Sequence, residues 1–115
     1  MALITSHVLN GIDGTHAFGV KVQLLELKKT SAPIFETETD ANGRLSQSLG
    51  DSAFEDMVCD LVFFTGDYWS HVLTDKRKFS INDQVVVRFR ISDPSGHYHM
   101  PLILSPNTYC VWMSG

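Results

Sequence analysis

The chain has 115 residues, of which 43% are hydrophobic and 19% charged, and its formal net charge is −4 at pH 7. This length predicts one compact domain over residues 1–115, with a core large enough to need no metal or disulfide support. The negative charge argues against nucleic acid as a partner, because the basic cluster Lys76-Arg77-Lys78 directly follows Asp75. The apolar runs are far shorter than the roughly twenty residues of a membrane span, so we expect no membrane association.

The two cysteines, Cys59 and Cys110, bear on the cellular compartment. A secreted scaffold built on disulfides would carry more of them, and residues 1–9 lack the charged and apolar regions of a secretory signal. We therefore expect a reducing, cytoplasmic location. Cys59 lies in an apolar run and is expected to be a core residue rather than a reactive thiolate.

Apolar residues recur with a period of two along most of the chain, which is typical of strands. The expected strands, in chain order, cover residues 2–9, 20–27, 33–39, 57–64, 85–91, 97–104 and 109–112. The segment 57–64 is almost continuously apolar and is predicted to be a central strand. In 85–91 the odd positions are apolar and should pack inward, whereas Arg88 and Arg90 should face water.

The breaks between these segments predict a turn and a helix. Asp40-Ala41-Asn42-Gly43 contains an Asn-Gly pair, which accepts a positive φ and is a strong turn signal. In 65–75, Asp67 is expected to cap a short helix with an apolar stripe of Trp69, Val72 and Leu73. Many short strands with one short helix favour an all-β fold, an antiparallel β-sandwich.

The sequence is rich in histidine, with five in 115 residues, two of them in His97-Tyr98-His99. Alternate side chains of a strand point the same way, so His97 and His99 should project from one face, with Pro101 indicating an edge or a bulge nearby. The plainest interpretation of any one histidine is a half-buried polar residue. A zinc site with His7 as third ligand is the alternative that requires a metal.

A reaction without a metal or cofactor requires fewer groups, and it is the chemistry that we expect. One neutral imidazole can take a proton from water while another holds or protonates the reacting amide. Arg44, just after the predicted turn, can hold a planar anion through two hydrogen bonds, although a solvated arginine is the default interpretation there. A serine nucleophile is not expected, because no Gly-x-Ser-x-Gly elbow is present.

Several separated motifs resemble, in the right order, the transthyretin-like family and within it the hydroxyisourate hydrolase branch. They are Ser6-His7-Val8-Leu9, Thr39-Asp40-Ala41-Asn42-Gly43-Arg44, Thr65-Gly66-Asp67-Tyr68-Trp69, Ser92-Asp93-Pro94-Ser95-Gly96-His97-Tyr98-His99-Met100-Pro101-Leu102 and Leu104-Ser105-Pro106. The resemblance implies a sandwich of two four-stranded sheets. It also implies a homotetramer, a dimer of dimers, with active sites in a channel between subunits.

The implied activity is hydrolysis of 5-hydroxyisourate, a small heterocycle of urate degradation, by ring opening at the cyclic amide. By motif match the catalytic residues are His7, Arg44 and His99. The two histidines would activate water and shuttle the proton, and Arg44 would orient the anionic substrate. The presence of these polar residues favours the hydrolase branch over the hormone-carrier branch.

The C-terminal tail departs from that branch, which ends in Tyr-Arg-Gly-Ser where this chain has Trp112-Met113-Ser114-Gly115. We expect substrate contacts from His97, Trp112, Met113 and Ser114. A tail of this kind makes the pocket more apolar, which leaves two alternatives open. One is an enzyme acting on another cyclic substrate in a biosynthetic pathway, and the other is a non-catalytic tetramer that binds a small ligand.

Overall fold

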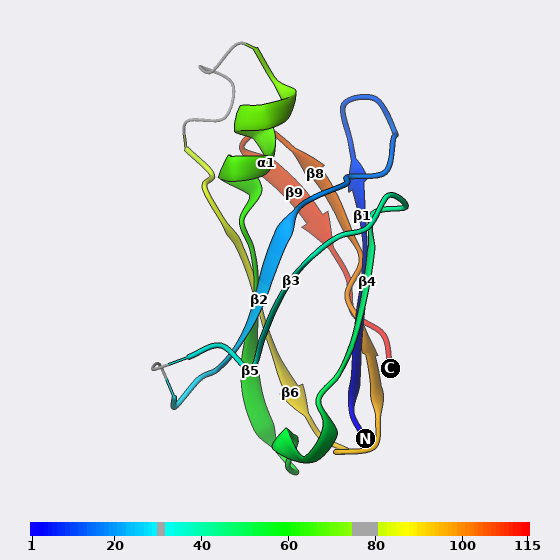
Figure 1. Cartoon of the computed structure of the whole chain (residues 1–115), viewed down its shortest axis with the longest axis vertical. Helices are drawn as coiled ribbons and strands as arrows, with labels where there is room; N and C mark the ends of the chain where they lie inside the picture. The colour runs from blue at the N-terminus through cyan, green and yellow to red at the C-terminus, as the bar shows by residue number, and fades with distance from the viewer. Residues whose placement is uncertain (30–31, 75–80) are drawn as a thin grey trace.

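The computed structural model describes residues 1–29, 32–74 and 81–115 (Figure 1). The basic cluster Lys76-Arg77-Lys78 and Asp75, where the expected helix was to end, lie outside the described residues. The elements are, in chain order, β1 (Leu3–Asn10), β2 (Lys21–Glu26), β3 (Phe35–Glu38), β4 (Arg44–Ser48), η1 (Gly50–Ser52), β5 (Met57–Phe63), α1 (Thr65–Val72), β6 (Val85–Ile91), β7 (His97–His99), β8 (Leu102–Ser105) and β9 (Thr108–Val111).

Within the described residues, the strands form two sheets that face each other across a common core (Figure 1). One sheet has the order β4-β1-β8-β9, and β7 pairs with β1 beside β8. The other has the order β3-β2-β5-β6. The predicted β-sandwich with a short helix is therefore confirmed. The prediction of β5 as a central strand is also confirmed, because β2 and β6 flank it.

The first sheet differs from the predicted all-antiparallel arrangement in two ways. β1 pairs in parallel with both β7 and β8, so this sheet is mixed and has five strands. The chain crosses from the second sheet after β6 and enters the first in the direction of β1. In addition, the expected continuous strand over 97–104 is broken at Met100-Pro101, because proline cannot donate a ladder hydrogen bond.

The alternation predicted for residues 85–91 is confirmed. Val85, Val87, Phe89 and Ile91 are buried, whereas Arg88 is exposed and forms a bidentate ion pair with Asp60, its partner in the register, at 2.8 and 3.0 Å. Asp60 thus interrupts an apolar run because one side of β5 meets water. Charged residues on that face leave the opposite face to the core.

The turn at residues 40–43 connects β3 in one sheet to β4 in the other, and β4 itself was not predicted. Gly43 has φ +71°, as the Asn-Gly signal requires. The Asp40 carboxylate accepts hydrogen bonds from the backbone N–H groups of Asn42 and Arg44, each at 2.9 Å. β4 reads Arg-Leu-Ser-Gln-Ser, whose single apolar residue, Leu45, gives too weak an alternation to indicate a strand.

Two details of the predicted helix are wrong. The N-cap residue is Phe64, which makes no side-chain cap bond, and Asp67 lies inside the first turn. Val72 is exposed rather than part of a buried stripe, because the helix packs through Tyr68 and Trp69. Among the described residues, no helix has the length and hydropathy needed to cross a membrane.

The core lies between the sheets and contains Cys59, as predicted. Burial raises the pKa of the Cys59 thiol to about 11, which removes it from nucleophilic chemistry at neutral pH. The largest fully buried side chain of the core is that of Trp69, which belongs to α1. The helix α1 lies over one end of the sandwich (Figure 1). The apolar residues of the strands therefore face the core, and the outward positions of the first sheet are open to polar side chains.

Candidate functional site

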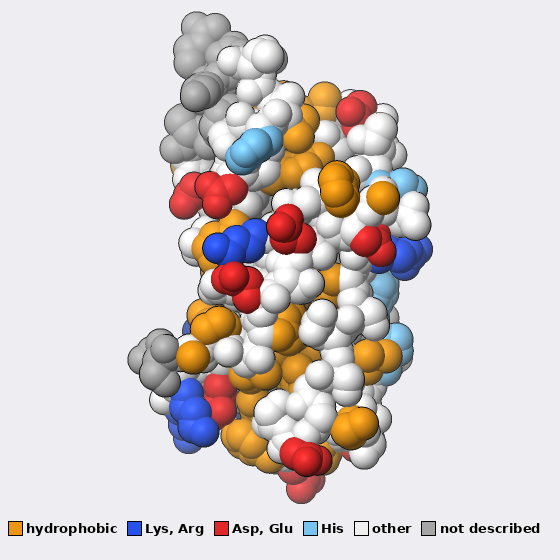
Figure 2. All heavy atoms as spheres, in the orientation of Figure 1, with side chains coloured by type: hydrophobic (Ala, Val, Ile, Leu, Met, Phe, Trp, Pro, Cys, Tyr) orange, Lys and Arg blue, Asp and Glu red, His pale blue; other side chains and the backbone are white. Residues whose placement is uncertain are grey.

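The outward face of β1 carries the first site residues. Along this strand Ile4, Ser6 and Val8 are buried, so Thr5 and His7 project from the opposite face. Both are partly exposed. This face belongs to the side of the molecule along which histidine side chains gather in Figure 2.

Arg44 reaches this face because it opens β4 directly opposite His7 in the antiparallel register. The hydrogen bond from its backbone N–H to the Asp40 carboxylate fixes where the strand begins. Hydrogen bonds from Arg44 and Asn42 lower the pKa of Asp40, so this carboxylate stays ionised beside the arginine. The turn signal in the sequence therefore sets the position of the arginine next to His7.

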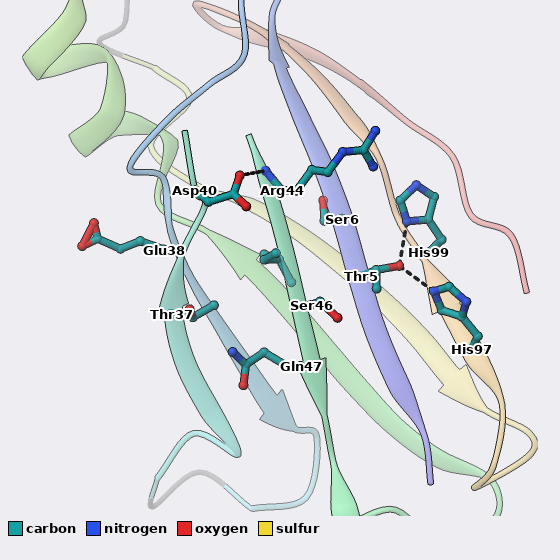
Figure 3. A pocket seen from close by; sticks show the side chains of 11 residues that line it. Thr5, Ser6, Thr37, Glu38, Asp40, Arg44, Ser46, Gln47, His97 and His99 are labelled. Carbon is teal, nitrogen blue, oxygen red and sulfur yellow. Dashed lines mark hydrogen bonds between the residues drawn. The ribbon is translucent and has the colours of Figure 1, made fainter. Parts of the chain in front are cut away.

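His97 and His99 enter from the other side of β1, on β7. In the parallel register Leu3 lies beside His97 and Thr5 beside His99. The Thr5 hydroxyl oxygen lies 2.7 Å from both His97 Nε2 and His99 Nδ1 (Figure 3). The two rings are 6.3 Å apart between centroids. The expectation that they share a face is confirmed, because one hydroxyl bridges them.

The structure adds a histidine that the sequence did not single out. His16 Nδ1 lies 3.1 Å from His7 Nε2, and the two rings are 5.2 Å apart between centroids. His16 is held by backbone pairing with Leu9, and its neighbour Ala17 donates to the Val8 carbonyl. No motif marked His16, because the loop after β1 must fold back before its side chain meets His7.

The electrostatic environment keeps two of these imidazoles neutral. Burial lowers the pKa of His7, and the charges of Arg44 and His16 lower it further. Burial also lowers the pKa of His99, with additional effects from His97 and Arg44. A lowered pKa favours the neutral form of each ring near pH 7, and a neutral imidazole keeps one nitrogen as a hydrogen-bond and proton acceptor.

An open groove of about 690 Å³ lies beside these groups. Its lining residues come from β1, β3, the β3–β4 turn, β4 and β7: Thr5, Ser6, Thr37, Glu38, Asp40, Arg44, Leu45, Ser46, Gln47, His97 and His99 (Figure 3). Arg44 and His99 lie on opposite sides of β1 in the close-up, and their side chains extend toward each other. The groove thus offers the Arg44 cation and the imidazoles of His97 and His99 to one small molecule.

A family model described as the HIUase/Transthyretin family matches residues 4–113. The chain belongs to this family. The 5-hydroxyisourate hydrolase of Pseudomonas aeruginosa is 33% identical over 114 residues, which cover 97% of this chain and 90% of that protein. The family membership agrees with the resemblance drawn from the motifs.

Solved structures of the family share the fold. Klebsiella pneumoniae 5-hydroxyisourate hydrolase matches with a TM-score of 0.80 at 21% identity, covering 100% of both chains. Sea bream transthyretin in complex with thyroxine matches with a TM-score of 0.77 at 25% identity, covering 96% of this chain and 93% of that one. Both an enzyme and a protein that binds thyroxine are therefore built on this sandwich.

The predicted site residues fall into two groups in the structure. His7, Arg44, His97 and His99 come together on one sheet face, although His7 itself does not line the groove. The tail residues Trp112, Met113 and Ser114 do not line the groove of the single chain.

The tail nevertheless runs next to this face. Ser114 and His99 exchange two backbone hydrogen bonds of 2.9 Å, so the tail lies along β7 at the histidine. Trp112 and Met113 are 50% and 57% exposed, which leaves both side chains available for contacts outside the chain.

The zinc alternative requires at least three ligand side chains that converge on one point. Within the described residues, no three His, Cys, Asp or Glu side chains gather in an arrangement that could hold a metal ion. His7 is paired with His16, while His97 and His99 both point a nitrogen at Thr5. His7 and His16 thus form a direct pair, whereas the Thr5 hydroxyl bridges His97 and His99.

Proposed function

We propose that this protein hydrolyses 5-hydroxyisourate, opening its six-membered ring at the cyclic amide. The observation that carries the proposal is the register of β1, which places His7 opposite Arg44 and Thr5 beside His99 on one sheet face. This arrangement brings together from distant stretches the three residues matched to the hydrolase motifs. The 33% identity to a 5-hydroxyisourate hydrolase supports it.

In the proposed reaction, a neutral imidazole removes a proton from water as its oxygen attacks the ring carbonyl. The C–N bond of the amide then breaks, and the same proton, carried by an imidazole, passes to the departing nitrogen. His7 and His99 share these two steps, since the pKa of each is lowered. Arg44 holds the anionic ring through paired N–H donors, and His97 contacts it from the exposed end of β7.

We further propose a homotetramer, a dimer of dimers, in which a second copy closes the groove. The exposed Trp112 and Met113 support this, because they offer apolar surface beside the site. In this arrangement Trp112, Met113 and Ser114 would reach substrate across the interface. A cytoplasmic location is also part of the proposal, and it is supported by the unpaired state of Cys59 and Cys110.

The direct test follows the ultraviolet absorbance of freshly generated 5-hydroxyisourate with and without protein. Wild type should accelerate the decay, and His99→Ala and Arg44→Lys should reduce kcat/KM by about tenfold or more, since each removes a charge-assisted or proton-transfer contact. His71→Ala is the matched control, because His71 lies on α1 and does not line this groove. Equal decay with all four proteins, or none above buffer, would refute the proposal.

The altered tail supports a second candidate, an enzyme of the same chemistry that acts on a different cyclic substrate. Here Met113 stands where the hydrolase tail has arginine. The quadruple variant Trp112→Tyr, Met113→Arg, Ser114→Gly and Gly115→Ser separates the two. If wild type is inactive on 5-hydroxyisourate and this variant is active, the tail selects the substrate and the second candidate is favoured.

A further inference from the structure

We propose that Thr5 is a positioning residue whose hydroxyl, shared between the neutral rings of His97 and His99, favours the same tautomer in both. The proposal starts from a geometric fact. The Thr5 oxygen lies 2.7 Å from a nitrogen of each ring, Nε2 in His97 and Nδ1 in His99. The coupling stands independently of the reaction, and only its catalytic consequence rests on the proposed function.

A hydroxyl group can donate one hydrogen bond, so it cannot donate to both rings. In one direction, His99 Nδ1–H donates to Thr5 and the hydroxyl donates to His97 Nε2. Each neutral ring then carries its proton on Nδ1. In the other direction, His97 Nε2–H donates to Thr5 and the hydroxyl donates to His99 Nδ1. Each neutral ring then carries its proton on Nε2. A mixed pair of tautomers is less favourable in either form. If both nitrogens are lone pairs, they compete for one hydroxyl proton; if both are N–H groups, they fill the two lone pairs of the oxygen and leave the hydroxyl proton without an acceptor among the described residues.

The surroundings of His99 select the first direction. Arg44 extends toward His99 across β1, and its positive charge lowers the pKa of that ring. A cation favours a lone pair over an N–H group on the side that it faces. His97 is another titratable group beside this ring, and burial together with the charges of His97 and Arg44 lowers the pKa of His99. His99 therefore presents the Nε2 lone pair, which a general base requires.

The backbone holds this arrangement in place. Met100 N–H donates to the Thr5 carbonyl at 3.0 Å, and His99 exchanges backbone bonds with Ser114 on its other side. Thr5 is a β-branched strand residue with restricted χ1 rotation. The hydroxyl is thus fixed between the two rings.

In the proposed reaction the chain of three groups also carries a proton. When His99 Nε2 accepts a proton from water, its Nδ1 proton can move to the Thr5 oxygen as the hydroxyl proton moves to His97 Nε2. His99 is then neutral with a proton on Nε2, and the positive charge rests on His97. When Nε2 gives its proton to the departing nitrogen, the hydroxyl proton of Thr5 returns to His99 Nδ1 and the His97 Nε2 proton returns to the Thr5 oxygen, so both rings end in their starting state. His97 is the more exposed ring, where water stabilises the charge.

The test is an NMR measurement of the two tautomers by long-range ¹H–¹⁵N correlation, at a pH where both rings are neutral. Wild type should show His97 and His99 both protonated on Nδ1. Thr5→Ser should retain this pattern, whereas Thr5→Val should return both rings toward the Nε2 form that free histidine prefers in water. Thr37→Val is the matched control, because Thr37 lines the same groove from β3.

Two outcomes would overturn the proposal: different tautomers in wild-type His97 and His99, or Thr5→Val spectra identical to wild type. Because Val keeps the branched shape of Thr, circular dichroism and thermal unfolding should show an intact fold. In the absorbance assay, Thr5→Val should lower kcat about tenfold with little change in KM, and Thr5→Ser should restore it. If wild type has no activity, the proposed function fails, while the tautomer measurement still decides the role of Thr5.

Discussion

Replacing Gly43 by alanine tests how the β3–β4 turn positions Arg44. Gly43 has φ +71°, and a Cβ at this position would overlap the Val8 carbonyl oxygen and lie 3.2 Å from the Ala17 backbone nitrogen. Gly14 provides the matched control, because it has φ +76° but no atom within 4 Å of such a Cβ. Both variants place an alanine at a positive φ, but only in Gly43→Ala does the new Cβ come too close to neighbouring backbone atoms.

The left-handed conformation costs an L-residue about 1–2 kcal/mol, reduced by about 0.5 kcal/mol because alanine stiffens the unfolded chain. Gly14→Ala should therefore lose about 1 kcal/mol. Gly43→Ala must also shift the turn away from β1, which weakens the 2.7 Å hydrogen bond from Val8 N–H to the Gly43 carbonyl. Leaving the buried Val8 N–H without an acceptor costs about 1–3 kcal/mol more, so the total loss of stability in Gly43→Ala is about 3 kcal/mol.

Thermal unfolding at equal protein concentration measures the difference. At about 4 °C per kcal/mol for a chain of this size, Gly43→Ala should melt about 8 °C below Gly14→Ala. Arg44 follows the displaced residue, so the activity of Gly43→Ala should fall while that of Gly14→Ala stays at the wild-type level. Equal melting temperatures for the two variants would show that the turn does not press against β1.

Three further predictions concern the imidazoles and the core. The pKa values of His7 and His99 are lowered from 6.5, so the unfolded chain binds protons at a higher pH than the folded chain does. The free energy of unfolding, measured by urea titration at a series of pH values, should therefore decline as the pH falls below 6.5. Activity should decline at lower pH, where the two imidazoles of the folded protein become protonated, and a pH–rate profile checks this. His16→Ala should raise the pKa of His7 in an NMR titration, since the charge of His16 lowers it. Trp69→Ala should cost about 3–5 kcal/mol in urea unfolding, because Trp69 is fully buried.

The sequence predicted those parts of the fold in which one face of a strand is dry and the other wet. Residues 85–91 alternate strictly, and β6 has the predicted bounds and faces. β4 was missed because four of its five side chains are polar, and its strand conformation comes from pairing with β1. The parallel pairing of β1 with β7 and β8 could not be predicted either, because apolar and polar residues alternate in the same way in parallel and antiparallel strands.

The candidate site shows the same division between local and long-range information. Motifs indicated His7, Arg44 and His99 one at a time, but only the register of β1 with β4 and β7 places them on one face. Thr5 and His16 carry no motif signal, because a threonine in a strand and a histidine in a loop are ordinary residues. They gain a role from hydrogen bonds across 94 and 9 positions of the chain.

The parallel pairing explains why a short strand can serve the site. In a parallel pair, β7 advances in the same direction as β1, so His97 and His99 follow the outward positions of β1 in step. The break at Met100-Pro101 then separates β7 from β8, and Ile103 replaces histidine as the outward residue beside Leu9. The polar groups are thus confined to one end of the sheet face, and an apolar surface adjoins them where we propose that a second copy packs.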